Sequence, residues 1–223
     1  MADYILRLYT DVLAENTTII ADNTSTTRCF YILNGIASIT TDTVTTTLSQ
    51  NSAWFSNSPV SILAGKEGAQ ILRFELVSNK NKDIEDIKTD NNVTSTQKIT
   101  ADIALVPGDH YLLRGDRVDI PTSGIAYPHV HQGPGIRCLI EGAFSVETGG
   151  VTHEIATGDA WFEAGPEPVK AWAPDDDVAS FYRVMVLPRS LKGKSSISYI
   201  NEEDNDKPKR QKYTIFIDHF IEI

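Results

Sequence analysis

The sequence predicts an all-β protein built from two tandem copies of one domain. Shifting the chain by 107 residues aligns residues 4–60 with residues 111–167 without a gap and gives twelve identical positions, among them Gly35/Gly142 and Trp54/Trp161. Short segments alternate apolar and polar residues, as half-buried strands do, and no segment shows the period of a long helix. A repeat of this length indicates two homologous domains.

Each copy contains a predicted hairpin of two alternating runs. The first hairpin spans Phe30–Thr47 with a turn at residues 41–42, and the second spans Arg137–Ile155 with a turn at residues 149–150. Further strands are expected at Ala53–Phe55, Ile71–Val77, Ile103–Val106, Tyr111–Leu113, Ala160–Phe162, Ser180–Leu187 and Tyr213–Ile217. Turn residues separate these runs at the spacing of a sandwich or barrel.

The domain boundaries follow from the repeat and from two polar stretches. We expect an N-terminal barrel over 1–77, a linker over 78–97, a C-terminal barrel over 98–190, and a charged loop with a final strand over 191–223. The linker is rich in Asn and Lys and lacks a periodic pattern. One short helical turn is expected within it, at Ile84–Ile87.

Composition excludes several partners. Lys and Arg total 20 against 30 Asp and Glu, so the net charge is −10, and such a chain repels nucleic-acid phosphates. No run reaches the ~18 apolar residues that span a bilayer. Its first residues lack the pattern of a signal peptide, and Cys29 and Cys138 are too few for a disulfide framework. We therefore expect a cytoplasmic protein with no nucleic-acid or membrane partner.

The residues best suited to chemistry lie between 123 and 142. His129 and His131 are two apart on a predicted strand, so their side chains share a face, and imidazole is a ligand of Zn, Cu, Fe and Ni. The same alternation places Tyr127 and Arg137 on that face. Alone, this spacing is equally typical of two surface histidines.

The surrounding motifs resemble those of the cupin superfamily. The His-x-His pair is followed by a Gly-rich stretch, an apolar run ending at Gly142, and Gly158-Asp159 with prolines nearby. The resemblance covers about residues 109–188 and extends to the first copy through the repeat. It implies two tandem jelly-roll barrels, a bicupin, and a divalent transition metal (Fe, Mn, Ni or Zn) held by three His and one Glu.

This sequence departs from the cupin motifs at two ligand positions. Gly135 stands where the family has its Glu, and Val169 or Lys170 stands where it has its third His. The resemblance therefore leaves His129 and His131 as candidate metal ligands, with Glu163 or a cosubstrate completing the shell. An open catalytic site normally keeps three protein ligands, so the presence of the metal stays open.

The remaining polar residues predict a pocket in the second barrel. An arginine inside a barrel must meet an internal carboxylate or an anionic ligand, because an unpaired buried charge costs several kcal/mol. For Arg137 the structural alternative is an ion pair with Glu163 or Glu141. The expected roles are substrate binding for Arg137, Lys170 and Trp172, and proton transfer for Glu163 or Tyr127.

The first copy serves as an internal control. His129, His131 and Arg137 align with Asp22, Thr24 and Phe30, so the polar set is confined to the second barrel. We expect the first barrel to be structural, and the chain to be a monomer or a homodimer.

Two function classes remain. One is a metal-dependent enzyme (an isomerase, dioxygenase, decarboxylase or lyase) acting on a small polar or carboxylate metabolite. The other is a non-catalytic cupin that binds or senses a metabolite through an eroded metal site. The fold does not choose between them.

Overall fold

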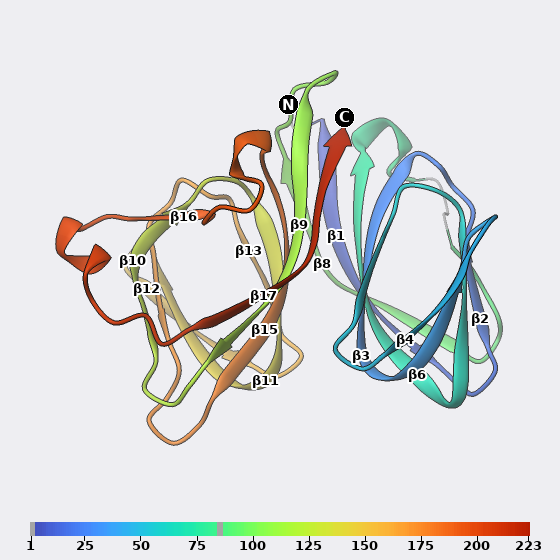
Figure 1. Cartoon of the computed structure of the whole chain (residues 1–223), viewed down its shortest axis with the longest axis horizontal. Helices are drawn as coiled ribbons and strands as arrows, with labels where there is room; N and C mark the ends of the chain where they lie inside the picture. Colours follow the sequence, from blue (N-terminus) through green and yellow to red (C-terminus); the bar gives the residue numbers. More distant parts are fainter. Residues whose placement is uncertain (1–2, 84–86) are drawn as a thin grey trace. The chain divides into compact units, whose positions relative to one another are not determined.

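A computed structural model describes residues 3–83 and 87–223 (Figure 1). The chain divides into two compact units, Met1–Pro107 and Gly108–Ile223. Both are built from strands, which confirms the all-β prediction and the two tandem barrels. No helix in the described residues is long and apolar enough to cross a membrane.

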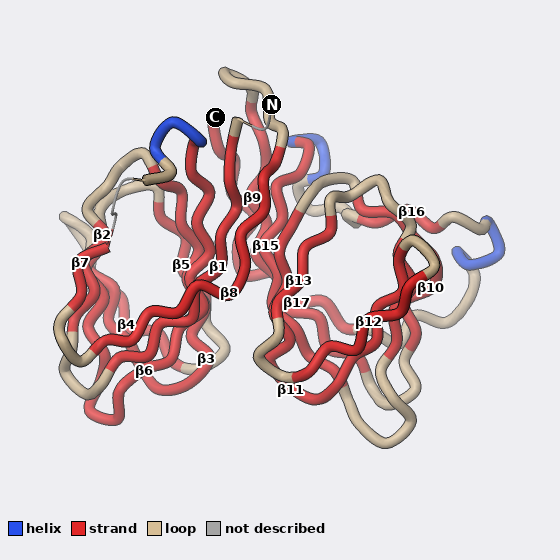
Figure 2. The backbone as a smooth tube through the Cα atoms, turned by 180° about the vertical axis from the view of Figure 1, so that it is seen from behind, coloured by secondary structure: helices blue, strands red, loops and turns tan. Residues whose placement is uncertain are grey.

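The first unit is one curled sheet (Figure 2). Its order is β4-β3-β6-β1-β8, while β2 pairs with β6 and β7, and β5 pairs with β3. The strands are β1 (Tyr4–Leu13), β2 (Thr18–Ala21), β3 (Thr26–Thr40), β4 (Thr45–Ser49), β5 (Ala53–Ser56), β6 (Val60–Ser78), β7 (Ile87–Thr89) and β8 (Val93–Ile103).

The linker expected over 78–97 is wrong in its second half. β7 pairs with β2, and β8 pairs along the whole of β1, so both strands belong to the first unit. β8 lies at the edge of its sheet and most of its side chains are exposed, which is why its sequence reads as unpatterned. A 3₁₀ turn, η1 (Asn79–Asn81), begins the segment; of the helical turn expected at 84–87, only Ile87 is among the described residues, and it lies in β7.

The second unit repeats this plan, with two strands in place of the long β6. Its sheet order is β16-β10-β14-β11-β15-β9-β17, and β12 and β13 pair with β11. The elements are β9 (His110–Ile120), β10 (Ile125–His131), β11 (Gly135–Thr148), β12 (Val151–Ala156), β13 (Ala160–Glu163), β14 (Val169–Trp172), β15 (Ala179–Pro188), η2 (Arg189–Leu191), β16 (Ile197–Tyr199), η3 (Glu202–Asn205) and β17 (Lys212–Glu222). The predicted final strand is β17, which lies along β9.

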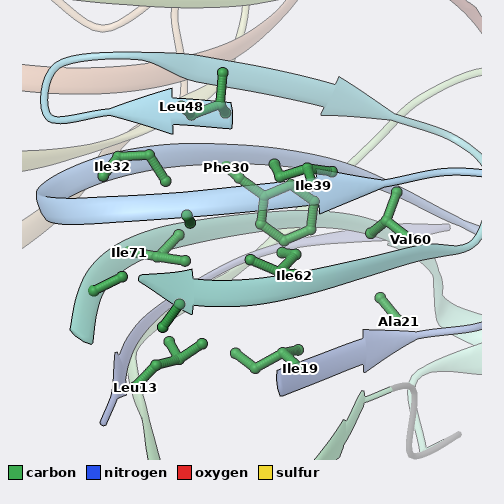
Figure 3. Packing of buried hydrophobic residues seen from close by; sticks show 13 residues of the cluster. Leu13, Ile19, Ala21, Phe30, Ile32, Ile39, Leu48, Val60, Ile62 and Ile71 are labelled. Atoms are coloured by element: carbon green, nitrogen blue, oxygen red, sulfur yellow. The ribbon is translucent and has the colours of Figure 1, made fainter. Parts of the chain in front are cut away.

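The lumen of the first barrel is filled with apolar side chains. Phe30 lies among Ile19, Ile39, Ile62 and Val60 (Figure 3). In the second barrel an apolar cluster of similar size includes Leu139, Phe144 and Phe181. Registers match between the copies: Phe30 pairs with Trp54, and Arg137 pairs with Trp161. The second barrel therefore carries an arginine where the first carries a core phenylalanine.

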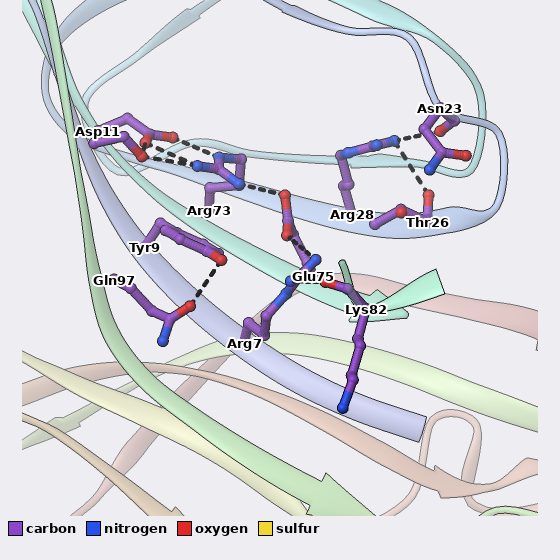
Figure 4. A network of polar contacts seen from close by, with 11 residues as sticks. Arg7, Tyr9, Asp11, Asn23, Thr26, Arg28, Arg73, Glu75, Lys82 and Gln97 are labelled. Carbon is purple, nitrogen blue, oxygen red and sulfur yellow. Dashed lines mark hydrogen bonds and ion pairs between the residues drawn. The ribbon is translucent and has the colours of Figure 1, made fainter. Parts of the chain in front are cut away.

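Arginines that recur in both copies are bound by carboxylates. In the first unit, Arg73 bonds Asp11 through Nε (2.7 Å) and Nη2 (3.0 Å) and also contacts Glu75, which in turn pairs with Arg7 at 3.0 Å (Figure 4). In the second unit, Arg183 bonds Asp116 at 2.6 and 3.0 Å, and Arg114 bonds Asp218 at 2.9 Å. Burial opposes the charge of Arg73, but Asp11 and Glu75 together outweigh burial and raise the pKa of Arg73.

The glycine that recurs at the end of the apolar run is required by a close backbone approach. Gly142 has φ +77°, and an added Cβ would lie 1.8 Å from the Val178 carbonyl oxygen. Gly150 has the same φ of +77° but nothing within 4 Å. We expect Gly150→Ala to cost about 1 kcal/mol from the left-handed backbone alone, and Gly142→Ala to cost roughly 2 kcal/mol more from the clash. Urea unfolding of the two variants checks this, and equal losses would contradict it.

Candidate functional site

Three strands bring four polar side chains together inside the second barrel. β10 supplies His129 and His131, each 5% exposed, β11 supplies Arg137, 1% exposed, and β13 supplies Glu163. All four line one small cavity of about 30 Å³. The two imidazoles and the guanidinium thus face the lumen, as the alternation predicts. We call these four residues the lumen cluster.

Glu163 is the centre of the lumen cluster. Its Oε2 lies 2.9 Å from His131 Nε2 and 2.8 Å from Arg137 Nη2. Its Oε1 accepts a hydrogen bond from Trp161 Nε1 at 2.8 Å. Arg137 also donates from Nη1 to the Gly135 carbonyl oxygen at 2.6 Å. Of the two alternatives for Arg137, the structure therefore contains the internal carboxylate.

The histidine tautomers follow from these contacts. His129 Nδ1 lies 2.7 Å from the Tyr127 carbonyl oxygen, so it must carry the proton and donate. In neutral His129 the Nε2 atom is then an acceptor, and it lies 3.2 Å from His131 Nε2. His131 Nε2 consequently carries a proton directed at His129 and Glu163. His131 Nδ1 is left as a buried acceptor without a partner in the described part of the chain.

Burial and neighbouring charges fix the protonation states. Burial, assisted by Arg137, lowers the pKa of His131 to about 3, and burial also lowers the pKa of His129. Burial alone would raise the pKa of Glu163, but Arg137 and His131 outweigh it and hold this pKa well below its usual range. Burial lowers the pKa of Arg137 to about 10 against the opposing effect of Glu163. At neutral pH the cluster holds one cation, one anion and two neutral imidazoles.

The structure does not bring Tyr127, Lys170 or Trp172 into the lumen. The pairing of β10 with β14 shifts register between Ala126 and His129, so the alternation is interrupted and Tyr127 does not share the face of His129. On β14, Val169 and Ala171 belong to the apolar core, and Lys170 and Trp172 alternate with them on the other face.

Outside the lumen these three residues form cation–π contacts. Lys170 Nζ lies 5.2 Å from the Trp172 ring centroid, and Lys207 Nζ lies 5.2 Å from that of Tyr127. Tyr127, Lys170 and Trp172 therefore do not lie in the pocket where they were expected. Of the residues predicted to bind substrate or transfer a proton, only Arg137 and Glu163 lie there.

The donor set does not fit a resident divalent metal. A Cβ on Gly135 would lie 2.6 Å from Met185 Cγ and 2.7 Å from the Val184 carbonyl oxygen, so that position cannot carry a ligand side chain. Where the cupin motif has its third His, Val169 of β14 packs in the apolar core and offers no metal ligand. Glu163 Oε2 already contacts the Arg137 cation. Among the described residues no group of three or more His, Cys, Asp or Glu side chains is arranged to hold a metal ion.

Sequence reasoning missed residues that complete the site. Trp161, which recurs as Trp54 in the first copy, packs against the core, and its Nε1 also donates a hydrogen bond to Glu163. Tyr199 of β16 pairs with His129, and Gln211 lines the lumen cavity while donating to the Ile125 carbonyl oxygen at 2.6 Å. β16 is three residues long and pairs with a strand about 70 positions earlier, so no local sequence pattern predicts it.

Comparison with solved structures identifies the fold. A variant of oxalate decarboxylase from Bacillus subtilis superposes with a TM-score of 0.66 at 13% identity, covering 91% of this chain and 73% of that one. AerE from Microcystis aeruginosa superposes with a TM-score of 0.61 at 12% identity, covering 83% of this chain and 88% of that one. The fold is that of a bicupin. No protein-family model and no curated protein sequence matches the chain.

The comparisons establish the bicupin fold and leave the site to be argued from its own residues. Another oxalate decarboxylase structure, obtained at pH 4.6, superposes with a TM-score of 0.66 at 12% identity over 93% of this chain and 73% of that one. Identities this low carry no residue role across. Within this chain, the contrast between the two barrels is the more direct guide.

The pKa shift of His131 predicts a pH-dependent stability. Unfolded His131 binds a proton below pH ~6.5, whereas folded His131 stays neutral down to about pH 3. Between these values the unfolded state binds more protons, so stability falls as the pH is lowered, by up to about 1.4 kcal/mol per pH unit. His131→Gln should flatten this slope between pH 6.5 and 4.5 in urea unfolding, whereas His153→Gln, on the exposed strand β12, should leave it unchanged. Identical slopes in all three proteins would contradict the shift.

Removing one partner of the buried ion pair should cost more than removing both. Arg137→Met leaves the Glu163 carboxylate buried without its cation and should lower the free energy of unfolding by roughly 3–5 kcal/mol. Adding Glu163→Gln to that variant should recover part of the loss. Arg117→Met, at a partly exposed pair with Asp119, is the matched control and should cost about 1 kcal/mol or less. Strictly additive losses in the double variant would exclude a strong Arg137–Glu163 interaction.

Proposed function

We propose that this protein is a bicupin whose C-terminal barrel binds a small polar metabolite at the lumen cluster without a resident metal. The N-terminal barrel is structural. Small-molecule partners are consistent with a chain whose net charge of −10 disfavours nucleic acid.

The observation that carries the proposal is the replacement of a core phenylalanine by a buried arginine. Phe30 and Arg137 occupy matching registers in the two barrels, and only the second barrel has histidines and a glutamate around that position. A scaffold needs only an apolar filling, as the first barrel demonstrates. Desolvating a guanidinium and a carboxylate is costly, and a hydrophobic pair of similar volume is often as stable. Binding is a function that would retain such a cluster.

The cluster offers complementary groups to a polar ligand. His131 Nδ1 is a buried acceptor without a partner in the described residues, and Arg137 Nη2 contacts Glu163 at 2.8 Å without hydrogen-bond alignment. The neutral imidazoles and the compensated ion pair favour a neutral or singly charged group over a multiply charged one. A ligand hydroxyl can donate to His131 Nδ1 and accept from Arg137, whereas a ligand carboxylate can accept from Arg137.

The competing function is a metal-dependent cupin enzyme in which His129 and His131 hold a divalent ion. It is favoured by a structural neighbour at 12% identity, Bacillus subtilis oxalate decarboxylase, which has Mn(II) centres. It is disfavoured by Gly135 and Val169 at the ligand positions and by the guanidinium beside Glu163.

Metal analysis separates the two functions. Protein purified without chelators, incubated with Mn²⁺, Fe²⁺ or Zn²⁺ and then dialysed, should retain well under one equivalent of metal. In its apo form, millimolar glycolate, pyruvate or glycerol should shift the NMR resonances of His129 and His131. One retained equivalent that is lost in His131→Ala would favour the enzyme and exclude the proposed function. No response of the histidine resonances to any of the three probes would also contradict it.

A further inference from the structure

A second, larger cavity adjoins the lumen cluster in the C-terminal barrel. Its volume is about 350 Å³, and it shares Arg183, Ile197 and Tyr213 with the wall of the 30 Å³ lumen cavity. The smaller cavity has room for about one water molecule, whereas pockets for small molecules begin near 300 Å³. We call the larger cavity the outer chamber. A metabolite that reaches the lumen cluster must place most of its atoms there.

The walls of the outer chamber come largely from outside the repeat. Residues 193–197 and Tyr199 form one side, and Tyr213 and Ile215 of β17 form another. Tyr199 also connects the chamber to the cluster, because it pairs with His129 and their ring centroids lie 6.4 Å apart. The segment that follows the second copy thus builds a chamber onto the barrel that carries the polar cluster.

Three donors in the chamber wall are available to a ligand. Arg183 uses Nε and Nη2 for Asp116, at 2.6 and 3.0 Å, and no bond of its Nη1 is seen within the described residues. The hydroxyls of Tyr199 and Tyr213 likewise show no hydrogen bond there. Burial raises the pKa of Tyr213 although Arg183 opposes it, so this hydroxyl stays protonated at neutral pH and donates.

Charge and shape of the walls define the class of ligand. The charged groups of the chamber, of the lumen cluster and of their ion-pair partners sum to one excess positive charge. The four cations are Arg114, Arg137, Arg183 and Lys194, and the three anions are Asp116, Glu163 and Asp218. Ile197, Ile215 and the two tyrosine rings give the chamber apolar and flat surfaces. A single negative charge on a flat apolar body is complementary to both features.

We propose that the outer chamber binds a small organic monocarboxylate with a flat apolar body. The carboxylate accepts hydrogen bonds from Arg183 Nη1 and the Tyr213 hydroxyl, and the body packs against Ile197 and Ile215. This inference rests on the proposed function, because the outer chamber is the space through which a ligand reaches the lumen cluster.

Calorimetry with three probes and the full chain tests the proposal. Benzoate should bind, whereas benzamide, which lacks the charge, and acetate, which lacks the body, should bind at least tenfold more weakly. Ile215→Trp fills the chamber and should weaken benzoate at least tenfold, and Tyr213→Phe should weaken it about tenfold. Val151→Trp is the matched control: Val151 is 55% exposed against 46% for Ile215, lies on β12, and should leave the affinity unchanged.

The outcomes separate failure of this inference from failure of the proposed function. No binding of benzoate, equal affinity for benzoate and benzamide, or unchanged affinity in Ile215→Trp would overturn the chamber assignment. If benzoate binds as expected while the His129 and His131 resonances respond to no probe, the chamber stands and the proposed function of the cluster fails.

Discussion

The ion pair between Arg137 and Glu163 is the constraint on which the site depends. Neither charge can remain in the lumen without the other, since each is almost fully desolvated. Their pairing keeps Glu163 ionised, and its Oε2 lies 2.9 Å from His131 Nε2. That contact fixes one imidazole, which in turn faces the second. Removing the pair would leave two histidines with no reason to be held at one orientation inside a barrel.

The same pair explains why the cupin ligand positions hold other residues. A guanidinium within 2.8 Å of the only carboxylate among the four cluster residues supplies positive charge next to the place where cupin motifs put a metal. Gly135 brings β11 so close to β15 that no side chain fits, and its carbonyl oxygen accepts a bond from Arg137. The local backbone and the charged side chain thus support one another. Placing a glutamate at 135 would require moving a strand, not just changing a side chain.

Sequence reasoning predicted the fold because its signals are local or repeated. The hairpins at Phe30–Thr47 and Arg137–Ile155 are β3–β4 and β11–β12, since alternation and turn residues suffice to specify an antiparallel pair. The inward direction of Arg137 followed from its distance to His131. Tyr127 was misplaced because a register shift interrupts β10; Pro128 lies within that shift, and a proline inside a strand is typical of a bulge. The boundary after residue 77 was misplaced because an edge strand with exposed polar side chains resembles a linker.

The parts of the site that the sequence did not reveal share one physical property, which is long-range pairing. Tyr199, Gln211 and Tyr213 reach the second barrel through β16, a hydrogen bond to Ile125 and the alignment of β17 with β9. Each contact closes a loop of about 70 residues or more, and such contacts depend on complementary surfaces that exist only after the barrel forms. The repeat predicted the barrel, and the histidine motif predicted its polar centre. The strands after the repeat belong to the shared fold, since β16 and β17 pair with β10 and β9 as β7 and β8 pair with β2 and β1. Their side chains build the space beside that centre, so specificity in this protein is set by side chains on a common scaffold rather than by added strands.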